Sequence, residues 1–526
     1  MSRLPRQTVR SAPVFSGEAV GRYVSDIRKP FVVVEDTVNR RIGLAPAEAG
    51  LEGLTTIGQL ARIYPEWLGE RRFTEAHGCR FPYIVGEMAR GVATPPMVVA
   101  AAKTGFLGFY GAAGLSIDTI SAGIREIARN VDALPWGSNL IHTPNEPGLE
   151  RATVDLYLDL GVERVSASAF MSLTTEIVRY AYRGIYTNRD GTIVRKNHVF
   201  AKISRPEVAA QFMRPAPAHI LDTLVSEQRL SRTEAGLARG LPVAEDITAE
   251  ADSGGHTDNR PMSVLLPLIL AERKRSGFPI RVGVAGGIGT PSAAAAAFAS
   301  GAAYILTGTV NQTAIESGLS EDGRAMLDGA GMADVAMAPC ADMFELGVKV
   351  QVLRKGSLYA QRATKLYELY RAYGSLDELP EKLRADLEQE IFRRSIGDIE
   401  KDVREFFVGR DPTQLEWAAS DPRHRMALVF RWYLGQSSRW PIAGETTRRT
   451  DYQIWCGPAI GAFNDWTAGS FLADSRERTV AQIGLNIMEG AAIAARAQQA
   501  RAHGIDVPAM LFNPSPRRLT VTNHEK

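Results

Sequence analysis

The sequence predicts an α/β fold: a (β/α)8 TIM barrel with an N-terminal cap and an additional helical subdomain towards the C-terminus. Between residues 81 and 310, eight short apolar runs each end in small or polar residues and are followed by a helical stretch. Eight strands that alternate with helices favour a closed barrel over an open, doubly wound sheet. The 526 residues exceed the size at which a single core usually stops growing, so additions to the barrel are expected.

The expected strands and helices can be placed one by one. The eight strands are expected within residues 81–91, 105–114, 134–142, 163–170, 198–204, 244–256, 280–289 and 302–310. Helical spacing is found in residues 94–103, 116–130, 148–160 and 290–300, and two of these segments begin with Thr-Pro, a favourable helix start. The segment 204–241 is longer than a simple crossover, which predicts a helical insertion before the sixth strand.

Three regions lie outside the barrel. Residues 1–80 contain one strand-like run, FVVVED, and are expected to form a small cap. Residues 311–410 are expected to form a helical extension, because 376–407 is charged and helical in its spacing. Residues 411–526 are rich in aromatic residues and glycine and are expected to pack on the barrel. Four tryptophans of this last region could form a compact core or a wall that faces a substrate: Trp432, Trp440, Trp455 and Trp466.

Composition excludes several partners. The 61 Lys and Arg residues nearly balance the 59 Asp and Glu residues, so no nucleic-acid partner is expected. Cys79, Cys340 and Cys456 are widely spaced, which predicts neither a disulfide framework nor a metal site and fits a reducing cytoplasm. The first 20 residues lack the apolar segment of a secretory signal. The uncharged run 292–310 approaches the length of a membrane span, but its small residues predict a buried helix and a strand, so no membrane partner is expected.

Glycines follow the last two expected strands, at the end of the barrel where such folds place their chemistry. Gly286 and Gly287 leave backbone N–H groups accessible to an anion, next to the start of a helix. Gly308 and Thr309 add an N–H group and a hydroxyl after the eighth strand. The two loops together predict a phosphate-binding cup, although these glycines could also merely turn the chain. Their spacing does not match the G-x-G-x-x-G of a dinucleotide-binding fold.

Other strand ends could line the face of a planar cofactor. Met88, Ala89 and Gly91 follow the first strand and allow close contact with the backbone. Asn139, in the third strand, carries an amide that can both donate and accept at a heteroaromatic edge. Lys202 is the lone cation of the fifth strand and could stabilise negative charge on a reduced ring, or simply form an ion pair.

The loop after the sixth strand combines polarity with little bulk. Gly254 and Gly255 would let a flat ligand lie against the backbone, with His256 above it as a proton donor or acceptor near neutral pH. A histidine in a loop can also be structural. Three further residues are expected to brace the loop: Asp258, Asn259 and Arg260. The arginine could instead bind an anionic group of a ligand.

These motifs resemble those of FMN-dependent enzymes related to nitronate monooxygenases, and more closely those of the PfaD group of enoyl reductases. The wider resemblance covers residues 81–309, through GEMARGVATPPMVVAAAKTGFLGFYGAAGL, SGGH and AGGIGTPSAAAAAFASGAAYILTGT. The resemblance to the PfaD group covers most of the chain, through EADSGGHTDNRP, DMFELGVKVQVLRKGSLYAQRATKLYELYR, RWYLGQSSRWP and DYQIWCGPAIGAFNDW.

The resemblance implies an enoyl reductase that binds FMN and uses NADPH. Its substrate would be an enoyl thioester on an acyl carrier protein, reduced in trans during polyketide or polyunsaturated fatty acid biosynthesis. The FMN phosphate would be held by Gly286, Gly287, Gly308 and Thr309. The ring would be surrounded by Met88, Ala89 and Asn139, with Lys202 at its pyrimidine edge. His256 or an ordered water would donate the proton.

Alternatives are a nitronate monooxygenase-like flavin oxidase, in which His256 would deprotonate a nitroalkane, and a non-catalytic scaffold that binds carrier proteins. A barrel of the inosinate dehydrogenase type is disfavoured, because no cysteine lies in an expected strand-end loop. An acidic carrier protein would need a basic docking surface, for which Arg393-Arg394 and Arg448-Arg449 are candidates. A homo-oligomer is left open.

Overall fold

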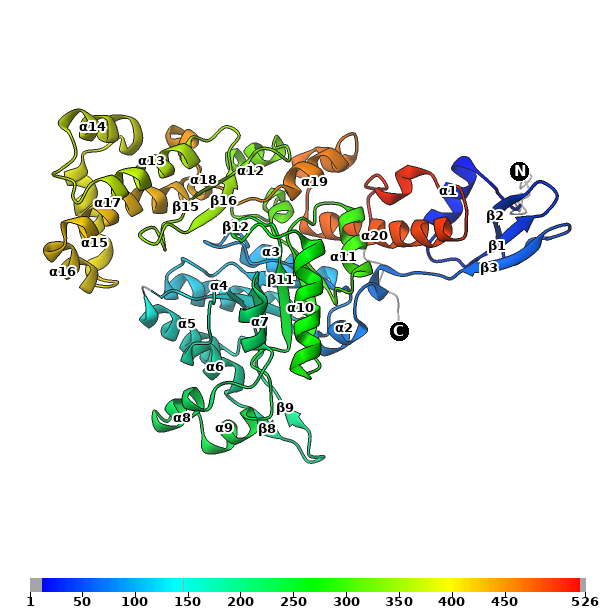
Figure 1. Cartoon of the computed structure of the whole chain (residues 1–526), viewed down its shortest axis with the longest axis horizontal. Coiled ribbons are helices and arrows are strands. Elements are labelled where there is room, and N and C mark those ends of the chain that lie inside the picture. Colours follow the sequence, from blue (N-terminus) through cyan, green and yellow to red (C-terminus); the bar gives the residue numbers. More distant parts are fainter. Residues whose placement is uncertain (1–11, 145, 521–526) are drawn as a thin grey trace, which may run out of the picture.

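The computed structural model describes residues 12–144 and 146–520, and a closed barrel of eight parallel strands forms its centre (Figure 1). The strands are β4 (Tyr83–Val85), β5 (Leu107–Tyr110), β6 (Trp136–Ile141), β7 (Arg164–Ser168), β10 (His198–Ile203), β11 (Asp246–Glu250), β13 (Arg281–Ala285) and β14 (Ile305–Thr307). Each lies within one of the eight predicted segments, so the predicted fold class is confirmed. Every residue of β11 and β13 is buried, as expected of strands with side chains inside the barrel and helices outside it.

Helices surround the barrel. They are α3 (Pro95–Thr104), α4 (Ile117–Val131), α5 (Pro147–Leu160), α6 (Thr175–Tyr182), α7 (Pro206–Phe212), α10 (Met262–Ser276) and α11 (Pro291–Ala299). The two predicted Thr-Pro starts are confirmed, because the hydroxyls of Thr94 and Thr290 accept hydrogen bonds from the N–H groups of Met97 and Ala293. The run 292–310 is divided between α11 and β14, and the described part of the chain contains no helix long and apolar enough to cross a membrane.

Helix α2 (Arg71–His77) closes the amino end of the barrel. The ring of Phe73 stacks on Tyr304 inside the barrel, with 4.4 Å between the ring centroids. His77 Nε2 lies 3.0 Å from Asp246 Oδ2, and Arg281 donates to the same carboxylate at 2.6 Å. Burial opposes the charge of Asp246, yet His77 and Arg281 hold the pKa of this carboxyl well below its usual range. These ionic contacts fix α2 to the first residues of β11 and β13.

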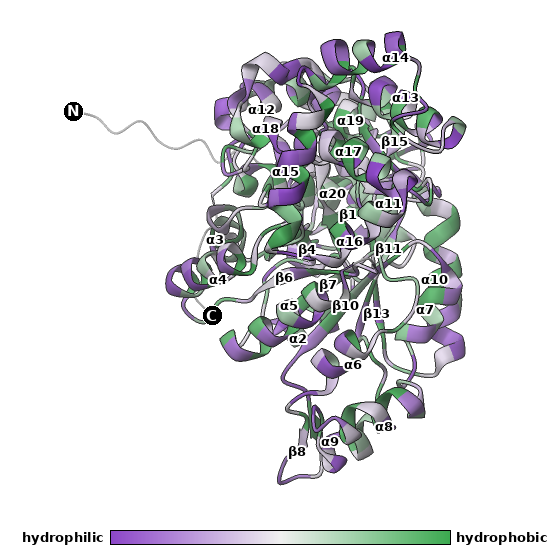
Figure 2. Ribbon diagram, turned by 90° about the vertical axis from the view of Figure 1, so that its left-hand side faces the viewer, coloured by the Kyte–Doolittle hydropathy of each residue, from purple (hydrophilic) through white to green (hydrophobic). Residues whose placement is uncertain are grey.

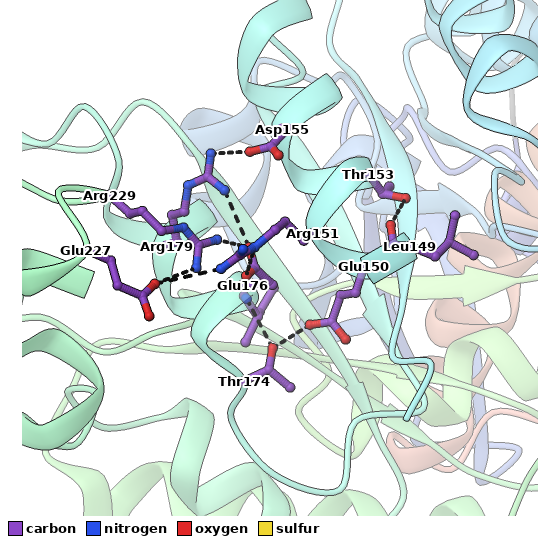
Figure 3. Close-up of polar contacts among 11 residues, drawn as sticks. Leu149, Glu150, Arg151, Thr153, Asp155, Thr174, Glu176, Arg179, Glu227 and Arg229 are labelled. Atoms are coloured by element: carbon purple, nitrogen blue, oxygen red, sulfur yellow. Dashed lines mark hydrogen bonds and ion pairs between the residues drawn. The ribbon is translucent and has the colours of Figure 1, made fainter. Parts of the chain in front are cut away.

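The predicted insertion forms α8 (Ala218–Ser226) and α9 (Arg232–Ala238), and ion pairs attach it to the barrel helices (Figure 3). Glu176 of α6 is buried and accepts from Arg151 of α5, at 3.3 Å, and from Arg229 of the insertion. Glu227 lies 3.7 Å from Arg151, which adds a second contact between the insertion and α5.

The N-terminal part forms a sheet that lies away from the barrel (Figure 1). Its antiparallel strands are β1 (Phe31–Asp36), β2 (Arg41–Pro46) and β3 (Thr55–Leu60), in the order β2-β1-β3, and α1 (Gly17–Ser25) packs beside them. The last long helix, α20 (Val480–Ala502), contacts both the barrel helix α11 and the sheet. Gly484 lets α20 approach the ring of Phe106, since a Cβ there would lie 2.4 Å from the ring. Arg496 of α20 donates to the carbonyl oxygens of Asp26 and Lys29.

A second unit covers the carboxyl end of the barrel. It begins with β15 (Val335–Pro339) and β16 (Lys349–Leu353), and β16 pairs with β12 (Gly255–His256) from the loop after β11. Its helices are α13 (Tyr359–Ala372), α14 (Glu381–Asp386), α15 (Ile396–Val408), α16 (Thr413–Ser420), α17 (Pro422–Ser437) and α18 (Trp440–Ala443). One apolar cluster extends from Ala338 to Leu434, so the segments on either side of residue 410 share a core. Figure 2 shows that α14 is largely hydrophilic on the outside of this unit.

Candidate active site

A cavity of about 610 Å³ lies at the carboxyl ends of the barrel strands, under the helical unit. A concave site between two units, lined by apolar groups and a few polar ones, is the usual form of a ligand pocket. Eleven residues predicted from the sequence line it: Met88, Ala89, Asn139, Lys202, Gly254, Gly255, His256, Gly286, Gly287, Gly308 and Thr309. Gly91 is not among the lining residues; its N–H group donates to Gly111, and its positive φ of 72° turns the chain after β4.

The loops after β13 and β14 form a cup of backbone donors. Gly286 has a φ of +91°, and a Cβ there would lie 2.6 Å from the carbonyl carbon of Ala251, so only glycine fits. The space beside Gly287 is open. No described residue accepts a hydrogen bond from the N–H groups of Gly287 or Thr309. Both groups belong to cavity-lining residues, which makes the cup suited to an oxyanion.

The N–H groups of Ser292 and Ala293, at the start of α11, already have partners within the protein. The N–H group of Ser292 donates to Asn513 at 3.0 Å, and that of Ala293 donates to the Thr290 hydroxyl. Gly289 packs against the carbonyl oxygen of Ala459. Chain segments from the C-terminal region therefore cover the helix start, which the sequence could not indicate.

The two glycines after β11 serve different purposes. A Cβ on Gly254 would lie 2.8 Å from the backbone of Cys456, so its missing side chain makes room for another chain segment. Gly255 has a φ of +82° and faces open space. Asn259 braces the loop as predicted, since its Nδ2 donates to Asp252 at 2.9 Å. Asp258 also braces the loop, through an ion pair with Arg205.

His256 forms an ion pair with a residue of the helical unit. Its Nε2 atom lies 3.2 Å from Oδ2 of Asp342, which follows β15. Burial favours the neutral imidazole, but Asp342 outweighs this effect and raises the pKa of His256. Burial also opposes the charge of Asp342, yet His256 holds the pKa of this carboxyl below its usual range. The only signal of Asp342 in the sequence is that it opens the family-like motif DMFELGVKVQ.

Cys340 lies beside this pair, and the ligand atoms of Cys340, His256 and Asp342 are all within 4.8 Å of one another. Burial raises the pKa of the Cys340 thiol well above its ordinary value. A thiol that holds its proton is a poor nucleophile and a poor metal ligand. The cysteine therefore contributes shape more than reactivity.

Lys202 is not a lone cation. Its Nζ lies 3.0 Å from Oε1 of Glu87 and 3.1 Å from Oε1 of Glu250. Glu250 ends β11, the strand next to β10, whereas Glu87 follows β4 on the opposite side of the barrel. Burial alone would lower the pKa of Lys202, but the two carboxylates raise it, so the lysine stays charged. Among the described residues, none donates to the buried Oε2 of Glu87. Asn139 donates to the Ser166 carbonyl, which leaves its Oδ1 available to a ligand.

The helical unit supplies the opposite wall. Trp432 and Trp455 line the cavity, whereas Trp440 lies outside it and contacts Trp432 at 6.5 Å between centroids. Two of the four tryptophans therefore belong to a cavity wall. Arg448 is 7% exposed and lies 4.0 Å from the Trp440 ring, so it cannot belong to a docking surface as the sequence suggested.

The chain resembles known proteins over most of its length. Residues 373–452 match the family model "[Acyl-carrier-protein] S-malonyltransferase, inserted helical domain". The chain is 45% identical to a component of the polyunsaturated fatty acid synthase of Thraustochytrium sp. over 437 residues, which are 81% of this chain and 29% of that protein. It is 43% identical to polyketide biosynthesis protein PksE of Bacillus subtilis over 440 residues, which are 82% of this chain and 57% of PksE. It thus spans less than two thirds of either curated relative.

One solved structure matches this chain over nearly the whole length of the solved domain. The crystal structure of the enoyl reductase domain of MlnA, from the macrolactin biosynthesis cluster of Bacillus amyloliquefaciens, superposes with a TM-score of 0.78 at 33% identity. The match covers 83% of this chain and 99% of that domain. The chain therefore belongs to the family of enoyl reductases of polyketide and polyunsaturated fatty acid synthases, which confirms the resemblance seen in its motifs.

Proposed function

We propose that this chain is an FMN-dependent enoyl reductase that uses NADPH and acts in trans on an enoyl thioester carried by an acyl carrier protein. The observation that carries the proposal is the single cavity in which a cup of backbone donors and the His256–Asp342 pair meet. Membership of the enoyl reductase family supports the reaction class.

The cavity fits FMN. Gly286 leaves space that a Cβ would fill, and the free N–H groups of Gly287 and Thr309 suit a phosphate. The unsatisfied Oε2 of Glu87 and Oδ1 of Asn139 suit the N–H edge of the ring. FMN, when bound, would take a hydride from NADPH and pass it to the β-carbon of the enoyl thioester.

His256 would supply the proton that the α-carbon requires. Asp342 Oδ2 lies 3.2 Å from Nε2 of the imidazole, and no described residue completes a hydrogen bond to this buried atom, so the imidazolium keeps a proton that it can donate. The raised pKa keeps the ring protonated to higher pH than an isolated histidine. After the transfer the imidazole is neutral and regains a proton from solvent, so each turnover consumes one NADPH and one proton.

The helical unit over the cavity supports the proposal that the substrate is bound to a carrier protein. Residues 373–452 match the inserted helical domain of an acyl-carrier-protein transferase, and α15 and α17 of this segment line the cavity. An acyl chain that enters between the barrel and these helices would pass the aromatic wall of Trp432 and Trp455.

The test is an assay of the FMN-loaded chain with NADPH and a crotonyl thioester, followed by one with a nitroalkane and oxygen. We expect NADPH oxidation that depends on the thioester and yields the saturated product. Turnover of the nitroalkane alone would replace the proposal with a flavin oxidase. A protein that takes up no flavin but binds carrier protein would replace it with a scaffold.

A further inference from the structure

Two arginines line the cavity without an ion-pair partner. Arg90 follows β4, and Arg439 directly precedes α18. Within residues 12–144 and 146–520, no carboxylate lies at ion-pair distance from either guanidinium. The two other arginines that line the cavity differ, because Arg410 pairs with Glu146 at 2.8 Å and Arg431 pairs with Glu345 at 3.1 Å. Arg90 is half-buried and Arg439 is exposed at the cavity wall, and a guanidinium without a carboxylate partner is available to an anionic ligand.

The backbone conformation of Arg90 is fixed by its surroundings. Its φ of +57° is a conformation that non-glycine residues rarely adopt. The backbone is held there because its N–H group donates to the Ala113 carbonyl at 2.8 Å. Its side chain lies over Gly114, where a Cβ would be 3.2 Å from Cγ of Arg90. Strained backbone that is held by its surroundings is common at ligand sites.

The electrostatics of the cavity point in the same direction. Burial, followed by the positive charge of Arg439, lowers the pKa of Arg90 to about 10, and Arg410 adds to this effect. Asp342 acts in the opposite direction, but it is already paired with His256. Glu405 also lines the cavity, at an exposed position of α15. The cations repel one another, and a bound anion would relieve this repulsion.

We propose that Arg90 and Arg439 form a binding subsite for a phosphate ester, distinct in its residues from the glycine cup. The inference rests on the proposed function, because both co-substrates of that reaction carry phosphate esters: the phosphodiester of a phosphopantetheine arm and the phosphates of NADPH. Guanidinium groups present paired N–H donors that match two phosphate oxygens. Because one arginine comes from the barrel and the other from the helical unit, the ligand would join both walls of the cavity.

The subsite can be tested without turnover. Calorimetry on the flavin-loaded full chain would compare 4′-phosphopantetheine with pantetheine, and would measure NADP⁺ in parallel. We expect at least one phosphorylated ligand to lose about tenfold in affinity in Arg439→Gln, as for the loss of one charge-assisted contact. Arg404→Gln is the matched control, since Arg404 is an exposed residue of α15 that does not line the cavity.

The two sources of the phosphate are separated by kinetics. If the carrier arm occupies the subsite, Arg439→Gln raises KM for crotonyl-phosphopantetheine and leaves KM for crotonyl-pantetheine and for NADPH unchanged. If the reductant occupies it, only KM for NADPH rises. Either result supports the subsite.

Three outcomes would overturn the subsite. The first is equal affinity of the wild-type protein for phosphopantetheine and pantetheine, together with unchanged NADP⁺ binding in Arg439→Gln. The second is that all binding and Michaelis constants are unchanged in Arg439→Gln, and the third is that loss of FMN is the sole effect of this substitution. A chain that shows the phosphate-dependent binding but reduces no enoyl thioester would keep the subsite and refute the reductase. If the wild-type chain reduces the thioester but Arg439→Gln leaves all binding and Michaelis constants unchanged, the reductase is kept and the subsite is refuted.

Discussion

Asp342 Oδ2 lies 3.2 Å from His256 Nε2, although the two residues belong to different units of the molecule. His256 is part of the loop after β11, and Asp342 is in the loop between β15 and β16. The pairing of β12 with β16 holds the two loops together, with His256 opposite Val350. The barrel therefore carries the imidazole, while the helical unit sets its charge.

Replacement of His256 with alanine removes the proposed proton donor. We expect His256→Ala to retain FMN, since the glycine cup is untouched, and to lose ~10²–10⁴ in kcat, the usual contribution of general acid catalysis. His219→Ala, at an exposed position of α8, serves as the control. A kcat within twofold of wild type would assign the proton to a water molecule.

Asp342→Asn tests the ion pair through the pH dependence of kcat. A protonated donor is active below its pKa, and its activity is lost as pH rises through that value. Asp342 raises the pKa of His256, whereas burial lowers it. Burial, Lys202 and Glu250 still act on the imidazole once the carboxylate is removed, but the largest effect that raises the pKa is gone, so we expect the high-pH limb of the profile to move to lower pH. An unmoved limb together with a lower kcat would indicate that Asp342 serves only to shape the site.

Gly286→Ala tests the anion cup. The new Cβ would lie 2.6 Å from the backbone of Ala251, in a conformation with φ of +91°. We expect a loss of about 1–3 kcal/mol in the free energy of unfolding and reduced FMN content, measured from flavin absorbance per mole of protein. Gly397→Ala on α15, where the space is open and φ is not positive, should change neither quantity. Full flavin content in the Gly286 variant would contradict the cup.

Arg281→Met tests the ionic contacts at the amino end of the barrel. The substitution leaves the carboxylate of Asp246 fully buried beside a histidine whose pKa is lowered, chiefly by burial. We expect a loss of about 3–5 kcal/mol in the free energy of unfolding, measured by urea denaturation, because one partner of a buried pair is removed. Arg275→Gln, which removes an exposed partner of Glu272, should cost at most about 1 kcal/mol. Equal losses in the two variants would contradict this interpretation.

The barrel could be predicted from the sequence because each strand has a local signal. Strands such as β13 are short apolar runs that end in glycine, and this pattern needs no knowledge of distant residues. The strands β15 and β16 could not be predicted in this way, since the segment 311–410 indicates only helices. They pair with each other, and β16 also pairs with β12, which is remote in the sequence.

The site residues also divide into those with a local signal in the sequence and those that depend on distant residues. Glycines and a histidine at strand ends are visible in the sequence, and eleven of the twelve predicted residues line one cavity. The partners that set their chemistry are not visible, because they come from other strands or from the helical unit. In the sequence Lys202 is a lone cation, whereas in the fold Glu87 and Glu250 flank it. Gly254 is expected from the sequence to face a ligand, but Cys456 occupies its open side.

Helix α20 packs against the N-terminal sheet, which is far from it in the sequence. Val33 and Leu60 of the first sheet share an apolar cluster with Ala492 and Ala497 of this helix. During synthesis on the ribosome, the N-terminal sheet would emerge long before the helix that covers it. Its apolar face stays uncovered by α20 until residues 480–502 have been translated. Folding of this sheet therefore cannot follow the order in which the chain is made.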